Sequence, residues 1–157
     1  MITMSQRLDY FTLSPKASGK YAEFSMLLTR SPFLAPLAHL VMLRASQING
    51  CAYCINMHTE DARKHGETEQ RLYLLNAWRE SPLYSERERA ALAWAETVTR
   101  VAQTAIPDQD YQAARAVFNE KQLVDLTIAI GLMNTYNRIA IGFRNPPQAV
   151  VEHSAAA

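Results

Sequence analysis

Apolar residues recur along this chain at intervals of three and four, the spacing that places side chains on one face of an α-helix. Tyr21, Phe24 and Leu28 show this spacing in the first third of the chain. The strict alternation of a β-strand is hard to find, and the helix-favouring residues Ala, Leu, Arg, Glu and Gln are plentiful. The pattern therefore predicts an all-α fold, in the form of a single-domain helical bundle.

Turn-forming residues divide this pattern into segments. Asn49-Gly50 tolerates the left-handed backbone of a tight turn, and prolines fall mostly between the periodic stretches. Ser85-Glu86-Arg87-Glu88 is a capping box, in which the first and last side chains bind each other's backbone N–H groups. These boundaries predict about six to seven helices, over residues 15–28, 33–47, 51–64, 68–78, 85–103, 109–118 and from 119 to a stop at Pro146-Pro147.

Composition and charge narrow the class of protein. The chain has 157 residues, 48% hydrophobic and 20% charged, which predicts one globular domain over 1–157 with a flexible tail at about 148–157. The formal charge of +1 lacks the basic excess of a protein that binds nucleic acid or anionic membranes. Since neither a signal peptide nor a membrane-spanning apolar run stands out, we expect a cytoplasmic protein with small-molecule or protein partners.

Candidate chemistry gathers around two cysteines that follow the Asn49-Gly50 turn. In a reducing compartment, a pair spaced like Cys51 and Cys54 is more typical of catalysis or metal binding than of a structural disulfide. Helical spacing puts both sulfurs and His58 on one face, and the first turn of a helix stabilises a thiolate. His58 can accept a thiol proton as a neutral imidazole or stabilise the thiolate as an imidazolium. We therefore predict a redox-active pair.

Such a pair supports a complete redox cycle, although other interpretations stay open. A peroxide would oxidise one sulfur to a sulfenic acid, the other sulfur would displace water, and an external thiol would reduce the resulting disulfide. The cysteines could instead be inert core residues, or they could bind zinc together with His58 and either His39 or His65. The motif for covalent haem attachment is missing, because Ile55 rather than histidine follows the second cysteine.

The segment 43–58 reads LRASQINGCAYCINMH and resembles the signature of the alkyl hydroperoxidase D (AhpD)-like branch of the carboxymuconolactone decarboxylase family. The similarity continues through segments 62–68, 78–82 and 91–96. The resemblance implies an all-α AhpD-like fold that assembles as trimers or hexamers. It also implies a peroxidase or disulfide-reductase activity in antioxidant defence, without a bound metal or cofactor.

The resemblance further implies a role for each residue of the motif. Cys54 would be oxidised to the sulfenic acid, Cys51 would resolve it, and His58 would help to deprotonate Cys54. An external dithiol, for which the family suggests a lipoyl-bearing protein, would reduce the disulfide. Two positions depart from the family pattern, since His39 stands where a glutamate is usual and Tyr53 where some peroxidases have histidine. Our hypothesis is that His39 replaces the glutamate as a proton acceptor or as a cation beside the thiolate.

These observations favour a thiol-dependent peroxidase or disulfide redox protein that acts on hydroperoxides as a homo-oligomer. One alternative is a non-enzymatic oligomeric stress protein that keeps the cysteines as a redox switch. Another is an enzyme that decarboxylates a lactone, which only the name of the family suggests and which does not need a cysteine pair.

Overall fold

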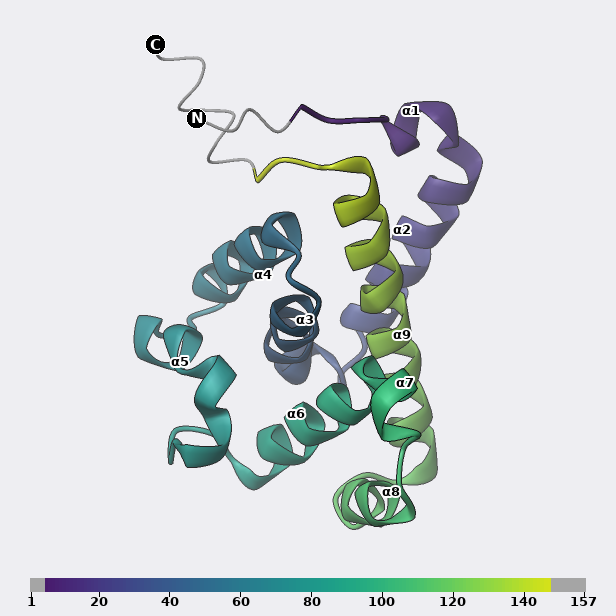
Figure 1. Cartoon of the computed structure of the whole chain (residues 1–157). Coiled ribbons are helices and arrows are strands. Elements are labelled where there is room, and N and C mark those ends of the chain that lie inside the picture. The colour runs from purple at the N-terminus through teal and green to yellow at the C-terminus, as the bar shows by residue number, and fades with distance from the viewer. Residues whose placement is uncertain (1–4, 148–157) are drawn as a thin grey trace.

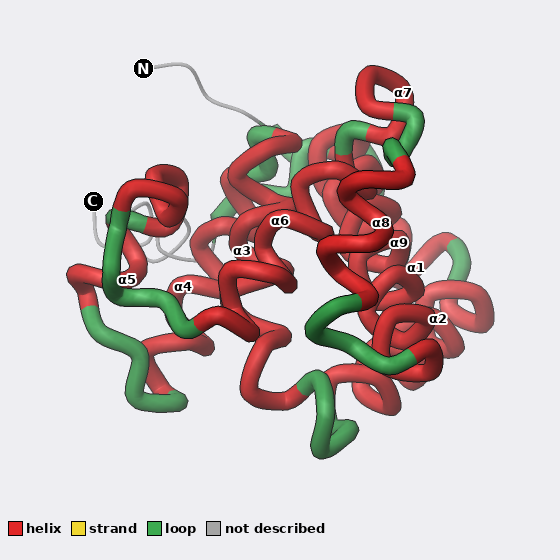
Figure 2. Tube along the Cα trace, turned by 90° about the horizontal axis from the view of Figure 1, so that it is seen from below, coloured by secondary structure: helices red, strands yellow, loops and turns green. Residues whose placement is uncertain are grey.

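The computed structural model describes residues 5–147, and every regular element within them is a helix (Figures 1 and 2). The predicted all-α class is confirmed. The 3₁₀ helix is labelled η1, and the elements in chain order are α1 Tyr10–Leu13, α2 Pro15–Thr29, α3 Ala35–Asn49, α4 Ala52–Lys64, α5 Glu69–Tyr73, η1 Leu75–Glu80, α6 Glu86–Thr99, α7 Val101–Thr104, α8 Asp108–Arg115 and α9 Glu120–Phe143. No helix among these residues is long and apolar enough to cross a membrane.

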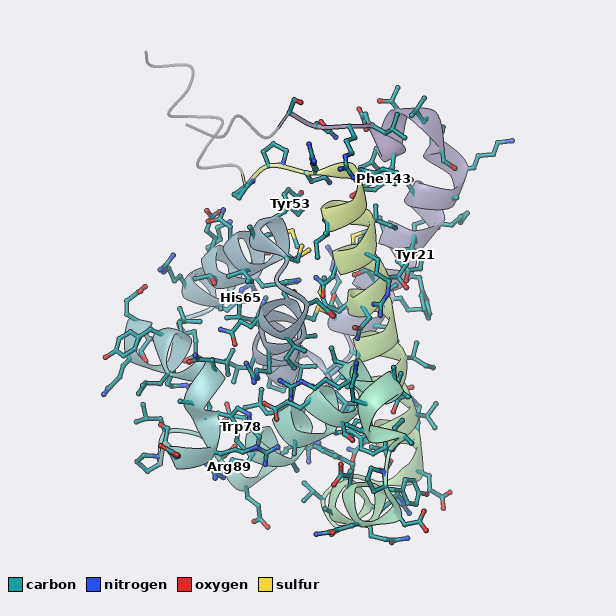
Figure 3. All side chains as sticks on the ribbon, viewed as in Figure 1. Tyr21, Tyr53, His65, Trp78, Arg89 and Phe143 are labelled. Carbon is teal, nitrogen blue, oxygen red and sulfur yellow. The ribbon has the colours of Figure 1, made fainter. Side chains whose placement is uncertain are left out.

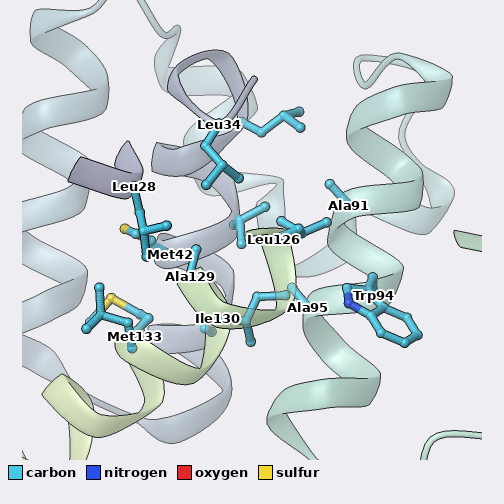
Figure 4. Packing of buried hydrophobic residues seen from close by; sticks show 14 of the residues in the cluster. Leu28, Leu34, Met42, Ala91, Trp94, Ala95, Leu126, Ala129, Ile130 and Met133 are labelled. Carbon is cyan, nitrogen blue, oxygen red and sulfur yellow. The ribbon is translucent and has the colours of Figure 1, made fainter. Parts of the chain in front are cut away.

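Helix α3 lies at the centre of the molecule and packs against α4, α6 and α9 (Figure 1). Its apolar residues contribute to two buried clusters. Met42 packs with Ala95 of α6 and Ile130 of α9 in the larger cluster (Figure 4). Leu43 joins a second cluster with Leu75 of η1. Because α3 is buried on both sides, it forms a rigid base for the residues that follow it.

Several predicted boundaries are confirmed by the cap geometry. Gly50 ends α3 with a left-handed φ of 70°. The capping box at α6 is formed, since Ser85 N donates to the Glu88 carboxylate at 2.8 Å and Glu88 N donates to Ser85 Oγ at 3.3 Å. Asn119 caps α9 by accepting a hydrogen bond from the backbone N–H of Gln122. Local side-chain chemistry therefore sets these helix ends.

The prediction of one helix over 68–78 is wrong. The segment divides into α5, which ends at Tyr73, and the 3₁₀ helix η1. Ala77 breaks the regular backbone with φ −115° and ψ 24°. The break lets Trp78 turn inward, where it is 3% exposed.

The prediction of a continuous helix over 85–103 is also wrong. Helix α6 ends at Thr99, and Arg100 leaves the helical region with φ −96° and ψ 30°. The hydroxyl of Thr104 in α7 donates to the carbonyl of Thr97 at 2.8 Å, which satisfies one of the carbonyls left at the end of α6.

The short helix α1 was not predicted. Asp9 caps it by accepting hydrogen bonds from two backbone N–H groups. Just before it, Arg7 N donates to the carbonyl of Phe143 at 2.9 Å, so the segment that leads into α1 lies against the end of α9. In α2, the ring of Tyr21 packs on that of Tyr136 with centroids 4.9 Å apart. The predicted tail at 148–157 lies outside the described residues.

Candidate active site

The turn between α3 and α4 places Cys51 at the N-cap of α4. The left-handed Gly50 reverses the chain, and Cys51 N donates to the carbonyl of Ser46 at 3.0 Å. Cys51 Sγ then accepts a hydrogen bond from the backbone N–H of Cys54 at 3.4 Å. A sulfur thus occupies the position where a serine or aspartate oxygen usually caps a helix, close to the positive end of the helix dipole.

A buried polar network from α9 fixes this turn. Asn137 is fully buried, donates to Ser46 Oγ at 3.0 Å and accepts from Asn49 Nδ2 at 2.8 Å. Asn49 also donates to Asn134 Oδ1 at 2.9 Å. The sequence pattern did not single out these two α9 asparagines. The signal that points to them is a pair of polar residues within the otherwise apolar face of a long helix.

The two cysteine sulfurs lie 2.8 Å apart, and both side chains are buried. The hydrogen bond from the Cys54 thiol lowers the pKa of Cys51 to about 7, although burial acts in the opposite direction. The Cys54 backbone N–H and the Asn137 amide also lower this pKa. The same thiol contact raises the pKa of Cys54. The pair therefore loses its first proton from Cys51 and keeps the second on Cys54.

Replacing Asn137 with leucine is expected to raise the pKa of Cys51, because the thiolate loses a donor. It also lowers the free energy of unfolding by roughly 1–3 kcal/mol, because Ser46 and Asn49 lose a buried partner. Thiolate absorbance followed against pH measures the first effect, and urea unfolding measures the second. Asn134→Leu is the matched control: it removes a neighbouring amide of the same network and leaves the thiol titration unchanged. Equal titrations for Asn137→Leu and wild type would contradict the assigned role.

His58 lies one turn after Cys54 in α4 and is 7% exposed. Burial lowers the pKa of His58 to about 4, with a smaller contribution from His39. The imidazole is therefore neutral near pH 7 and can accept a proton, but it does not stand as an imidazolium beside the thiolate. A neutral imidazole is compatible with the predicted role of proton acceptor, and that role stays a prediction.

His39 lies in α3 and contacts another histidine. Its ring packs on that of His65 with centroids 4.4 Å apart. Burial and the neighbouring His65 lower the pKa of His39. His39 is near enough to lower the pKa of His58, but it does not line the cavity beside Cys54. The proposed replacement of the family glutamate by His39 stays a prediction.

A cavity of about 250 Å³ opens beside Cys54. Its walls are predominantly apolar and come from α1, α2, α3, α4 and α9, and its lining residues are Tyr10, Phe11, Ala22, Ser25, Met26, Met42, Tyr53, Cys54, Met57, His58, Leu132, Met133, Tyr136 and Ala140. Figure 3 shows Tyr53 between α4 and the end of α9. The cavity thus brings together Cys54 and His58, two site residues predicted from the sequence. The apolar walls around them were not predicted. Cys51 contacts Cys54 but is not part of the lining.

Three tyrosines of the lining keep their hydroxyl protons near pH 7. Burial raises the pKa of Tyr136 to about 12. Burial also raises the pKa of Tyr10 and of Tyr53, and Cys54 contributes to both shifts. The phenols are therefore hydrogen-bond donors within an apolar cavity.

A zinc site has no support in the arrangement of side chains. Within residues 5–147, no group of three or more His, Cys, Asp or Glu side chains is placed so that it could hold a metal ion. His39 and His65, the candidate additional ligands, pack on each other.

Comparison with known proteins places this site in a family. The model of the carboxymuconolactone decarboxylase family matches residues 17–97, which include both cysteines and His58. The uncharacterized protein YdfG of Bacillus subtilis (strain 168) is 42% identical over 142 residues, which cover 90% of this chain and 97% of YdfG. The chain belongs to the carboxymuconolactone decarboxylase family.

A second curated protein and a solved structure are also similar to this chain. The uncharacterized protein YnjA of Escherichia coli (strain K12) is 30% identical over 121 residues, which cover 77% of this chain and 66% of YnjA. The crystal structure of ATU0492 from Agrobacterium tumefaciens superposes with a TM-score of 0.87 at 42% identity and covers 91% of this chain and 98% of its own. Its function is unknown, and a role as the antioxidant defence protein AhpD has been suggested for it.

A peroxidase-related protein from Silicibacter sp. TM1040 shares the fold, with a TM-score of 0.77 at 23% identity over 87% of this chain and 73% of that one. The AhpD-like resemblance of the motif is confirmed.

Proposed function

We propose that this chain is a thiol-dependent peroxidase of antioxidant defence that reduces organic hydroperoxides with Cys51 and Cys54. The observation that carries the proposal is that Cys54 forms part of the wall of an apolar cavity, in direct contact with a second cysteine outside that wall. A substrate in the cavity can therefore reach one sulfur, and the other stands ready to form a disulfide. The AhpD role suggested for ATU0492 is consistent with this chemistry.

The first chemical step needs Cys54 as a thiolate. Its proton can pass to the Cys51 thiolate, which lies in hydrogen-bonding contact, or to the neutral imidazole of His58. Cys54 Sγ then attacks the terminal oxygen of the hydroperoxide. The S–O bond forms, the O–O bond breaks, and the alkoxide takes up a proton and leaves as an alcohol.

The second step forms the disulfide. Cys51 attacks Cys54 Sγ, the S–S bond forms, the S–O bond breaks, and the hydroxide leaves with a proton as water. The peroxide has now been reduced by two electrons and the cysteine pair oxidised by two. An external dithiol, such as a lipoyl-type protein, restores both thiols by disulfide exchange.

The test is to titrate the reduced protein with cumene hydroperoxide while counting free thiols. We expect both thiols to disappear for one equivalent of peroxide, and we expect repeated turnover when a dithiol such as dihydrolipoamide is supplied. An organic group that buries about 60 Å² of apolar surface gains roughly 1.5 kcal/mol. The value of kcat/KM should therefore be about tenfold higher for cumene hydroperoxide than for hydrogen peroxide.

Two outcomes would contradict the proposal. Thiols that survive an excess of peroxide would exclude redox chemistry at the pair. Slow oxidation without turnover under any dithiol would instead favour a non-enzymatic redox switch.

A further inference from the structure

The side chain of Met133 in α9 contacts the imidazole of His58 in a way that the peroxidase cycle above does not use. Met133 Sδ lies 3.0 Å from His58 Nε2. Both residues are buried, with exposed fractions of 2% and 7%. The two atoms therefore interact directly, and the sign of the interaction depends on where the imidazole carries its proton.

Only one neutral form of His58 suits this contact. A thioether sulfur can accept a hydrogen bond but has no hydrogen to donate. A neutral imidazole carries its single proton on Nδ1 or on Nε2. With the proton on Nε2, the contact to Met133 is an N–H···S hydrogen bond. With a bare Nε2, the lone pairs of nitrogen and sulfur would face each other at 3.0 Å.

We infer that Met133 is a positioning residue that holds His58 in the Nε2–H form and leaves Nδ1 bare to accept the thiol proton. The effect of Met133 on the His58 proton does not depend on the proposed peroxidase function, whereas its catalytic consequence rests on that function. His58 follows Cys54 by one turn of α4, and both side chains line the same cavity.

The other cavity methionines provide the comparison. Met26, Met42 and Met57 line the same cavity as Met133. Among the described side chains, Met133 is the methionine whose sulfur contacts a histidine nitrogen. If any thioether in the cavity could influence the His58 proton, replacing any of the four methionines would have the same effect. If the hydrogen bond to His58 is responsible, only the replacement of Met133 has an effect.

The test is the ¹⁵N NMR signature of the His58 side chain in the reduced protein at neutral pH, assigned by its loss in His58→Gln. We expect Nε2 to carry the proton in the wild type. Met133→Leu keeps the volume but removes the acceptor, so the ratio of the two neutral forms should fall about two- to tenfold, the range of a neutral hydrogen bond. Met42→Leu removes a different thioether and should leave the ratio unchanged.

A second readout links the proton to reactivity. The alkylation rate of Cys54 at neutral pH should fall in Met133→Leu in proportion to the loss of bare Nδ1. A proton on Nδ1 in the wild type, or an unchanged ratio in Met133→Leu, would overturn the inference. Since the NMR measurement needs no peroxide, a failure of peroxide turnover would count against the proposed function alone.

Discussion

Replacing Cys54 with serine is expected to abolish the fast reaction with hydroperoxide. A hydroxyl at this position cannot be oxidised to a sulfenic acid, and Cys51 does not line the cavity in which we propose that the substrate binds. Stopped-flow measurement should show the rate constant falling by several orders of magnitude, as expected when a nucleophile is removed. The double variant Cys51→Ser/Cys54→Ser sets the baseline.

The companion variant Cys51→Ser separates attack from resolution. Cys54 should still react once with the peroxide, but without a partner the sulfenic acid persists and can be trapped by dimedone. The two variants are informative because the lower pKa favours Cys51 as the first thiolate, whereas Cys54 is the cysteine that lines the cavity. Fast oxidation in Cys54→Ser together with loss in Cys51→Ser would show that the roles are the reverse of those predicted.

The second large effect is expected for Glu96, a buried carboxylate in α6. It accepts hydrogen bonds from Arg44 Nε at 2.8 Å and from Trp78 Nε1 at 2.9 Å. Burial by itself raises the pKa of Glu96, but these hydrogen bonds outweigh burial and lower it. Glu96→Gln should lower the free energy of unfolding by about 3–5 kcal/mol, because the buried Arg44 loses its counter-charge. Urea unfolding measures the loss.

An exposed ion pair provides the control for Glu96. Glu23 pairs with Lys20 at 2.7 Å, but the two side chains are 61% and 79% exposed, so Glu23→Gln should change the stability by no more than about 0.5 kcal/mol. The lowered pKa of Glu96 adds a pH test. Its contribution is present above its ordinary pKa of 4.5 and is lost as the pH falls through the lowered value. The stability gap between wild type and Glu96→Gln should therefore narrow in acid, and a gap that stays constant would contradict this explanation.

The helices that local chemistry determines were predictable from the sequence. Asn49-Gly50 and the Ser85 capping box mark real helix ends because their side chains or backbone preferences act within one turn. The errors lie where tertiary contacts override propensity. The inward turn of Trp78 divides the segment 68–78, and Thr104 stabilises a break that the apolar periodicity of 85–103 does not reveal.

The part of the candidate site that lies within one stretch of sequence was predictable, and the part that α9 contributes was not. Cys51, Cys54 and His58 are close in sequence, so helical spacing is sufficient to bring them together. Met133 lies 75 residues after His58 in the sequence, and Asn137 lies 91 residues after Ser46. These two residues reach the site only through the packing of α9. Periodicity identifies such residues as buried, but it does not tell which cavity or sulfur they contact.

The family match covers only part of the cavity wall. The family match covers residues 17–97 and so includes the thiols and His58, whereas α1 and the α9 wall lie outside it. The matched segment therefore contains the reactive groups and the cavity walls from α2, α3 and α4, while the rest of the cavity wall comes from residues outside the match. Relatives with the same cysteines can still differ in the walls that α1 and α9 contribute, so the molecules that the cavity admits depend on both ends of the fold as well as on the motif.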